Sequence, residues 1–137
     1  MSRSVIDASI ALSWCFEDEA TPETDLLFAY VRDEGAVVPS LWHLELSNVL
    51  LQAEKRKRIS AEDVATRLRL ISALPIATDL ETSVKAWQDI LSIARVEGLT
   101  NYDAAYLELA IRFGTPLLTK DEHLARAARR RGIAIRP

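Results

Sequence analysis

The sequence has very little cysteine or histidine. It contains one cysteine, Cys15, and two histidines, His43 and His123. A single cysteine excludes an internal disulfide, and three scattered residues do not make a multi-cysteine or histidine-based zinc site. We therefore expect Cys15 to be a small buried side chain and the two histidines to lie at the surface.

Long apolar runs and a surplus of positive charge are also missing. No run approaches the ~20 apolar residues of a membrane-spanning helix, and the first residues lack the basic stretch and apolar block of a secretory signal. We expect a cytoplasmic protein without membrane contact. The net charge is −3, so binding of nucleic acid would depend on a local basic patch or on bound cations.

What is present is the composition of an ordinary folded domain. The chain has 137 residues, of which 49% are apolar and 27% charged, and we expect a single domain over residues 1–137. Short apolar segments alternate with segments of helical periodicity. This alternation predicts an α/β fold, a three-layer α/β/α sandwich with a short, mostly parallel central sheet. The predicted strands are residues 3–6, 36–38, 76–78, 115–118 and 133–135.

The predicted helices follow from apolar spacing and from residues that begin or end helices. Ser40 is expected to cap a helix from Leu41 to Lys57, and Ser60 to begin another that ends near Ala73. Further helices are expected over residues 22–35, 83–97 and 122–131, and one helix has Asp103 in its first turn. The expected buried positions of two of them are Leu46, Val49, Leu50 and Ala53, and then Val84, Trp87, Leu91 and Ala94.

Four acidic residues fall where a predicted strand ends or a predicted helix begins. Asp7 and Asp121 each follow a strand, whereas Glu45 and Asp103 lie in the first turns of helices. In open α/β sheets, ligands bind beyond the carboxyl ends of the strands, and the following helices start at that same edge. We therefore expect these four carboxylates to meet at one edge of the sheet.

Each acidic residue also has a purely structural interpretation. Asp7 can cap the short helix after it, and Thr100-x-x-Asp103 and Thr119-x-x-Glu122 both have the form of a capping box. Glu45 is a carboxylate near the amino end of a helix, where the helix dipole favours it. For one residue alone these interpretations are as good as a functional one. Four such residues at one edge favour a shared role.

Carboxylates without histidine or thiol partners suit Mg²⁺ or Mn²⁺ and not zinc. Two unit charges at 4 Å repel by ~1 kcal/mol in water and by ~4 kcal/mol at an effective dielectric constant near 20. Without metal, at least one carboxyl group should therefore hold its proton more tightly. A bound metal would cancel this repulsion, polarise a phosphoryl oxygen and lower the pKa of a bound water. This chemistry suits hydrolysis of a phosphodiester.

Four motifs, in this order, resemble those of the PIN domains, and most closely the VapC-type toxins of toxin–antitoxin pairs. They are Val5-Ile6-Asp7-Ala8-Ser9, Glu45-Leu46-Ser47-Asn48, Leu99-Thr100-x-Tyr102-Asp103-Ala104-Ala105-Tyr106 and Thr119-x-Asp121. The resemblance spans nearly the whole chain. It implies an α/β/α sandwich and a Mg²⁺- or Mn²⁺-dependent endoribonuclease. It also implies the toxin of a type II module, a homodimer inhibited by a VapB-type antitoxin.

The resemblance also assigns roles to residues of this chain. Asp7 and Asp103 are expected to be the principal metal ligands, and Glu45 and Asp121 to complete the site or position the attacking water. Ser9, Asn48 and Thr119 match supporting positions. Arg126 and Arg130 lie one helical turn apart after Asp121, and we expect them to contact RNA phosphates unless they only balance the helix dipole.

Two alternatives of other classes remain. A response-receiver-like signalling module would use Asp79 as phospho-acceptor and Lys120 as its lysine, but Asp7 has no acidic neighbour to complete such a site. A haloacid-dehalogenase-like phosphatase lacks its second aspartate for the same reason. A catalytically inactive PIN-fold binding protein is the other alternative, and the intact acidic set argues against it.

Overall fold

The computed structural model describes residues 3–136. Most of the chain is helical, and every strand is short. In chain order the elements are β1 (Ser4–Ile6), α1 (Ala8–Ser13), the 3₁₀ turn η1 (Glu17–Glu19), α2 (Pro22–Glu34), β2 (Ala36–Pro39), α3 (Leu41–Lys55), α4 (Ala61–Ser72), β3 (Ile76–Asp79), α5 (Thr82–Lys85), the π-helical η2 (Ala86–Ile90), α6 (Leu91–Glu97), α7 (Asn101–Phe113), β4 (Leu117–Leu118), α8 (Glu122–Arg130) and β5 (Ile135–Arg136).

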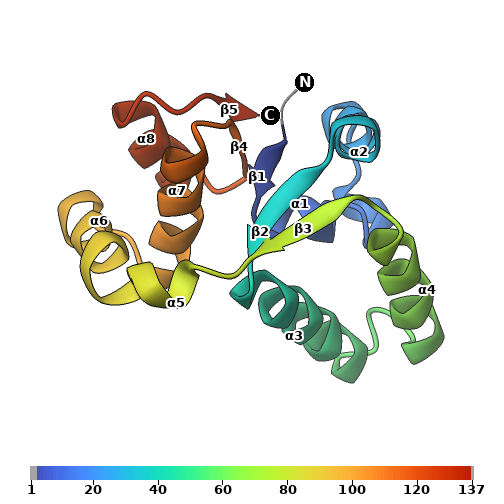
Figure 1. Ribbon diagram of the computed structural model, residues 1–137. Coiled ribbons are helices and arrows are strands. Elements are labelled where there is room, and N and C mark those ends of the chain that lie inside the picture. Colours follow the sequence, from blue (N-terminus) through green and yellow to red (C-terminus); the bar gives the residue numbers. More distant parts are fainter. Residues whose placement is uncertain (1–2, 137) are drawn as a thin grey trace.

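A parallel sheet in the order β3-β2-β1-β4-β5 forms the centre of the described residues. Val5 of the middle strand pairs with Val37 of β2 and with Leu117 of β4. Helices α1 to α4 lie on one side of the sheet and α5 to α8 on the other (Figure 1). Because both faces are covered, β1 and β4 are fully buried, and every residue in them except Ser4 is apolar. The predicted three-layer α/β/α fold is confirmed.

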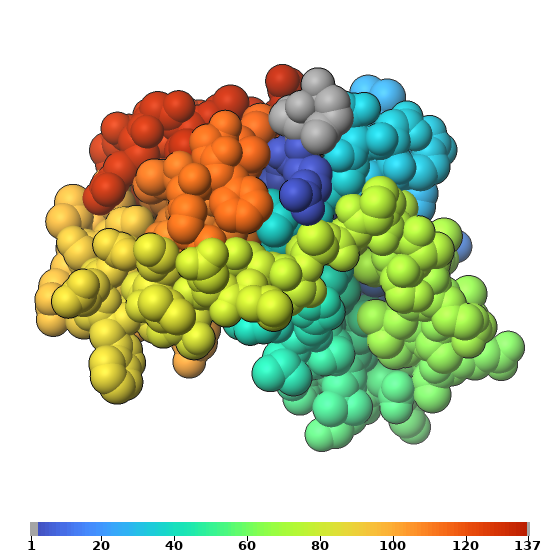
Figure 2. Space-filling view, in the orientation of Figure 1, coloured from blue at the N-terminus to red at the C-terminus, as the bar shows by residue number. Residues whose placement is uncertain are grey.

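The carboxyl ends of parallel strands reach the same edge of the sheet, and this edge positions the site. Helices α1, α3 and α5 start there, at the lower centre of Figure 1. Helix α7 packs on β1 and β2, which brings its first turn to the same place. The space-filling view shows the lower outline of the molecule hollowed between the yellow α5 region and the green α3–α4 region (Figure 2).

The start of α4 confirms its predicted cap, whereas the start of α3 does not. The Ser60 hydroxyl accepts a hydrogen bond from the Asp63 backbone amide at 3.0 Å. Ser40 is itself in a helical conformation and its side chain makes no capping bond, so that prediction is wrong. Helix α3 ends at Lys55, two residues earlier than expected, and Val49 is exposed although Leu46 and Leu50 of the same helix are buried.

The predicted helix over residues 83–97 is interrupted by the π-helical turn η2. A π turn places an extra residue in one turn and so rotates everything after it relative to an α-helix. Val84, before this turn, and Trp87, within it, are exposed, Trp87 by 89%, and the buried residues are Ile90, Ile93 and Ala94. The expectation of Val84 and Trp87 on the buried side is wrong.

Several smaller expectations are settled by burial and strand pairing. Cys15 is buried, as expected, and both histidines are exposed.

The last two strands are shorter than predicted, with only Leu117–Leu118 and Ile135–Arg136 in the sheet. Among the described residues, no helix is both long enough and apolar enough to cross a membrane. A single domain over residues 1–137 stays a prediction, because residues 1, 2 and 137 lie outside the described part.

Candidate active site

Asp7 is the most deeply buried carboxylate of the predicted set, with 6% of its surface exposed. It follows β1 and caps α1: its Oδ1 accepts a hydrogen bond from the Ile10 backbone amide at 3.3 Å. The same oxygen accepts from the Ser9 hydroxyl at 2.6 Å, and Oδ2 accepts from the Thr119 hydroxyl. The capping interpretation is thus confirmed, but it uses only one of the three donors directed at this carboxylate.

Ser9 and Thr119 connect the ends of the two strands β1 and β4. Each hydroxyl donates its proton to Asp7 and accepts a backbone amide from the loop after β4. Ser9 Oγ accepts from Lys120 N at 2.9 Å, and Thr119 Oγ1 accepts from Asp121 N at 3.0 Å. Both hydroxyls therefore have fixed donor and acceptor roles, and they hold the Asp7 carboxylate against the start of α8.

Asp121 and Asp103 occupy the starts of the next two helices at this edge. Asp121 caps α8, with its Oδ1 accepting from Leu124 N at 3.0 Å. Thr119 therefore does not cap this helix, and the predicted capping box with Glu122 is wrong. The Thr100 hydroxyl caps α7 by accepting from Asp103 N at 3.1 Å. That bond uses the Asp103 backbone, and the Thr100 side chain also lowers the pKa of the Asp103 carboxyl group, against the larger effect of its burial.

Glu45 reaches the site from α3, on the other side of the edge. Its Oε1 accepts a hydrogen bond from the phenolic hydroxyl of Tyr106 on α7. The sequence motif that contains Tyr106 does not by itself assign this residue a role. The signal that was available is its spacing: Tyr106 lies three residues after Asp103, so both side chains leave α7 on the same face.

The four carboxylates influence one another electrostatically. Burial raises the pKa of Asp7 to about 6, although its hydrogen bonds act in the opposite direction and Asp103 raises it further. Burial is also the main cause that raises the pKa of Glu45 and of Asp103; Asp103 adds to the first and Asp121 to the second. His123, exposed at the start of α8, partly offsets this at Asp103. Asp103 thus lies within electrostatic range of each of the other three predicted carboxylates.

This group carries negative charge without a matching basic side chain. Within residues 3–136, none of the four forms an ion pair with lysine or arginine. In the same range, no three Asp, Glu, His or Cys side chains are close enough together to enclose an ion as they stand. Mg²⁺ commonly binds through one or two carboxylates and keeps several waters. Carboxylate oxygens whose negative charge is not paired with lysine or arginine are suitable ligands for such a cation. The metal-binding role of each residue stays a prediction.

The remaining predicted site residues lie on α3 and α8 and have different surroundings. Asn48 and Glu45 line a groove of about 660 Å³ between α3 and α4. On α8, Arg130 pairs with Glu97 at 2.7 Å, and Arg126 lies 3.9 Å from Glu122. Contact of Arg126 and Arg130 with RNA phosphates stays a prediction, and for Arg130 it would compete with an existing ion pair.

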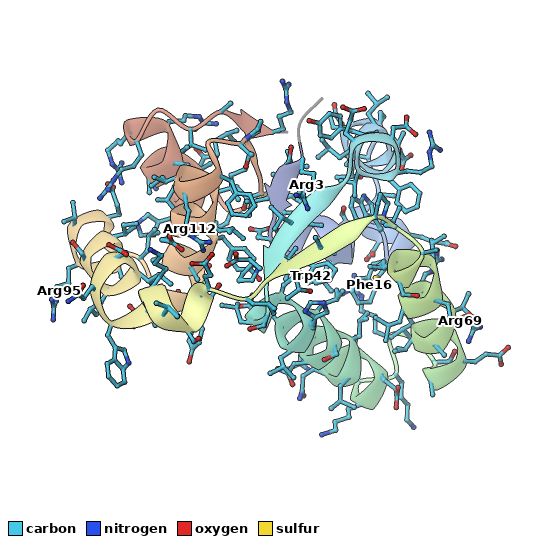
Figure 3. All side chains as sticks on the ribbon, in the orientation of Figure 1. Arg3, Phe16, Trp42, Arg69, Arg95 and Arg112 are labelled. Carbon is cyan, nitrogen blue, oxygen red and sulfur yellow. The ribbon has the colours of Figure 1, made fainter. Side chains whose placement is uncertain are left out.

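Asp79 does not have the surroundings of a phospho-acceptor. It lies on β3, an edge strand, and Arg112 of α7 donates to both its oxygens at 2.9 Å. Arg112 also lowers the pKa of Asp79 and pairs with the buried Glu108 at 2.8 Å. Figure 3 shows Arg112 on α7 facing the segment that joins β3 to α5. This ion network joins α7 to the edge of the sheet, and it does not support the receiver-like alternative.

Comparisons with known proteins agree with this fold. A family profile described as PIN domain matches residues 4–130 of the chain. Ribonuclease VapC3 of Pyrobaculum aerophilum is 25% identical over 123 residues, which cover 90% of this chain and 92% of that protein. The crystal structure of PAE2754 from the same organism has a similar fold, with a TM-score of 0.72 at 21% identity, covering 98% of this chain and 83% of that one.

Proposed function

The chain belongs to the PIN domain family, and from this premise we propose that it is a Mg²⁺- or Mn²⁺-dependent endoribonuclease. The observation that carries the proposal is the coupled acidic group at the carboxyl edge of the sheet, built around Asp7. Burial raises the pKa of Asp7, Glu45 and Asp103, and a carboxylate with a perturbed pKa at a strand edge is a candidate for a functional role. The similarity to a protein named Ribonuclease VapC3 supports RNA as the substrate.

Asp7 and Asp103 are the proposed principal ligands of the metal, with Glu45 and Asp121 completing the site. When bound, the metal would supply positive charge at a phosphoryl oxygen and a water of lowered pKa. The chain's own contribution is positioning. Ser9 and Thr119 fix both oxygens of Asp7, and Asp103 in the first turn of α7 is close enough to raise the pKa of Asp7.

Substrate binding follows from the same charge distribution. The net charge of −3 gives no general attraction to RNA. The bound cation and the arginines of α8 are therefore the proposed phosphate contacts, with Arg126 the more accessible of the predicted pair. Asn48 would support Glu45 from the next turn of α3.

We propose further that the protein acts as the toxin of a type II module, as a cytoplasmic homodimer that a VapB-type antitoxin inhibits. The exposed apolar side chains on α5 and η2, including Val84 and Trp87, support an interface between protein surfaces. Light scattering of the purified protein, alone and with the product of a neighbouring small gene, tests both partners.

The cleavage experiment uses total RNA, the purified protein and defined divalent ions. We expect cleavage with Mg²⁺ or Mn²⁺, none with a chelator, and none for Asp7→Asn or Asp103→Asn. Asp25→Asn, an exposed carboxylate on α2 outside the site, is the matched control and should cleave normally. Binding of RNA without cleavage under all these conditions would favour the inactive PIN-fold alternative.

A further inference from the structure

Tyr106 is a buried polar side chain to which the proposed mechanism gives no role. Only 1% of its surface is exposed, although its ring carries a hydroxyl that needs a partner inside a protein. That partner is Glu45 Oε1, 61 residues away in the sequence and on a different helix. The bond therefore connects α7 with α3 across the carboxyl edge of the sheet.

The Tyr106 hydroxyl has a defined hydrogen-bonding role at this place, because it donates to a carboxylate on the facing helix. Its proton is directed at one oxygen of Glu45, and the only bond that the described residues make to this carboxylate is the one to Oε1.

Glu45 needs such a partner more than Asp7 and Asp121 do. Asp7 and Asp121 are short side chains already fixed by capping bonds, whereas Glu45 is a longer, half-buried side chain on the first turns of α3. A free glutamate loses rotamer entropy when it is fixed on a ligand. A neighbouring donor that orients it beforehand reduces this cost, as groups behind metal ligands commonly do.

We propose that Tyr106 is a positioning residue that holds Glu45 through Oε1 and leaves Oε2 directed to the metal and its water. The inference rests on the proposed metal-dependent function and deepens it. Helix α7 then supplies two parts of the site at once: Asp103 as a ligand, and one turn later the donor that orients a ligand from α3. The inference also explains why a buried phenol, and not a phenylalanine, stands in this apolar stripe.

The test is Mn²⁺ binding by Tyr106→Phe, which removes one hydroxyl and keeps the ring. Binding is followed by the electron paramagnetic resonance signal of free Mn²⁺, so no activity is required. We expect the variant to bind Mn²⁺ about 10- to 100-fold more weakly, with a circular dichroism spectrum like that of the parent. Tyr102→Phe, the same change at an exposed position of the same helix, should bind as the parent does.

A second pair of variants separates positioning from a general structural effect. In a Glu45→Ala background the hydroxyl has nothing to orient, so adding Tyr106→Phe should leave Mn²⁺ affinity unchanged. If Tyr106→Phe binds Mn²⁺ as tightly as the parent, the inference is wrong and the proposed function stands. An equal loss in both backgrounds would also overturn it, because the hydroxyl would then act elsewhere. A parent protein that binds no Mn²⁺ would overturn both proposals.

Discussion

In the metal-free protein, Asp7→Asn should gain stability relative to the parent as the pH rises, although it removes a capping carboxylate. Burial raises the pKa of Asp7 from 3.8 to about 6, and one unit of pKa corresponds to ~1.4 kcal/mol. Keeping this carboxylate ionised therefore costs the folded state about 3 kcal/mol. Asparagine has nearly the same shape and no charge.

The direction of the pH dependence follows from the raised pKa. The folded protein holds the Asp7 proton to a higher pH than the unfolded chain does. The stability that this proton contributes is complete below pH 3.8, decreases as the pH rises, and is lost above about pH 6. The variant has no such group, so its stability does not follow this decrease. Any constant cost of fitting the amide among Ser9 and Thr119 cancels when two pH values are compared.

The assay is urea unfolding in the presence of a chelator, at about pH 4.5 and about pH 7.5. The parent has already lost part of this stability at pH 4.5. We therefore expect the free energy of unfolding of the variant, relative to that of the parent, to rise by about 2 kcal/mol between the two pH values. Asp25→Asn controls for the loss of an exposed carboxylate at a helix start. A stability difference that is the same at both pH values would refute the reasoning and leave Asp7 as an ordinary cap.

Three further predictions concern the metal, the ion network and the loop hydroxyls. Mn²⁺ at a hundred times its Kd should stabilise the parent by ~2.7 kcal/mol in thermal unfolding, and Asp7→Asn far less. Arg112→Met should cost ~3–5 kcal/mol in urea unfolding, because it leaves the buried carboxylates of Asp79 and Glu108 without their partner. Thr119→Val should slow RNA cleavage about 10- to 100-fold, because Asp7 loses a donor and the Asp121 amide loses its acceptor.

Matched variants make these results specific. Arg95 lies at the far side of α6 from the sheet (Figure 3), and Arg95→Met should change stability little. Thr119→Ser keeps the hydroxyl and should retain most of the cleavage rate that Thr119→Val loses. A stable Arg112→Met protein would show that the network is not needed to hold β3 against α7. Metal stabilisation of Asp7→Asn equal to that of the parent would place the cation elsewhere.

The sequence predicts those site residues whose positions depend only on neighbouring residues in the chain, such as residues at strand ends and helix starts. Asp7 and Asp121 follow apolar strands and cap helices, so their position at the strand ends can be read from neighbouring residues. Parallel pairing then brings the two strand ends together, and Ser9 and Thr119 with them. The first turn of α7 is equally local, because Thr100 caps it and Gly98 ends the helix before it.

The features that sequence missed depend on tertiary packing or on departures from ideal helices. The bond between Tyr106 and Glu45 joins residues that no local pattern relates. Trp87 lies in the π turn η2 and is exposed, although it was expected to be buried. The spacing of apolar residues in the sequence is the same with or without a π turn, so it could not reveal this turn. The sequence does not show that Asp79 is paired, because its partner Arg112 lies 33 residues later, near the end of α7.

The most direct test of the central claim is the anomalous difference map of a crystal of this protein soaked in Mn²⁺. The account predicts a peak at the carboxyl edge of the sheet, in contact with Asp7 and Asp103 and within reach of Glu45 Oε2. The same soak of Asp7→Asn crystals should show no peak there. A manganese peak bound only away from these carboxylates, in a protein that cleaves RNA with Mn²⁺, would contradict the account.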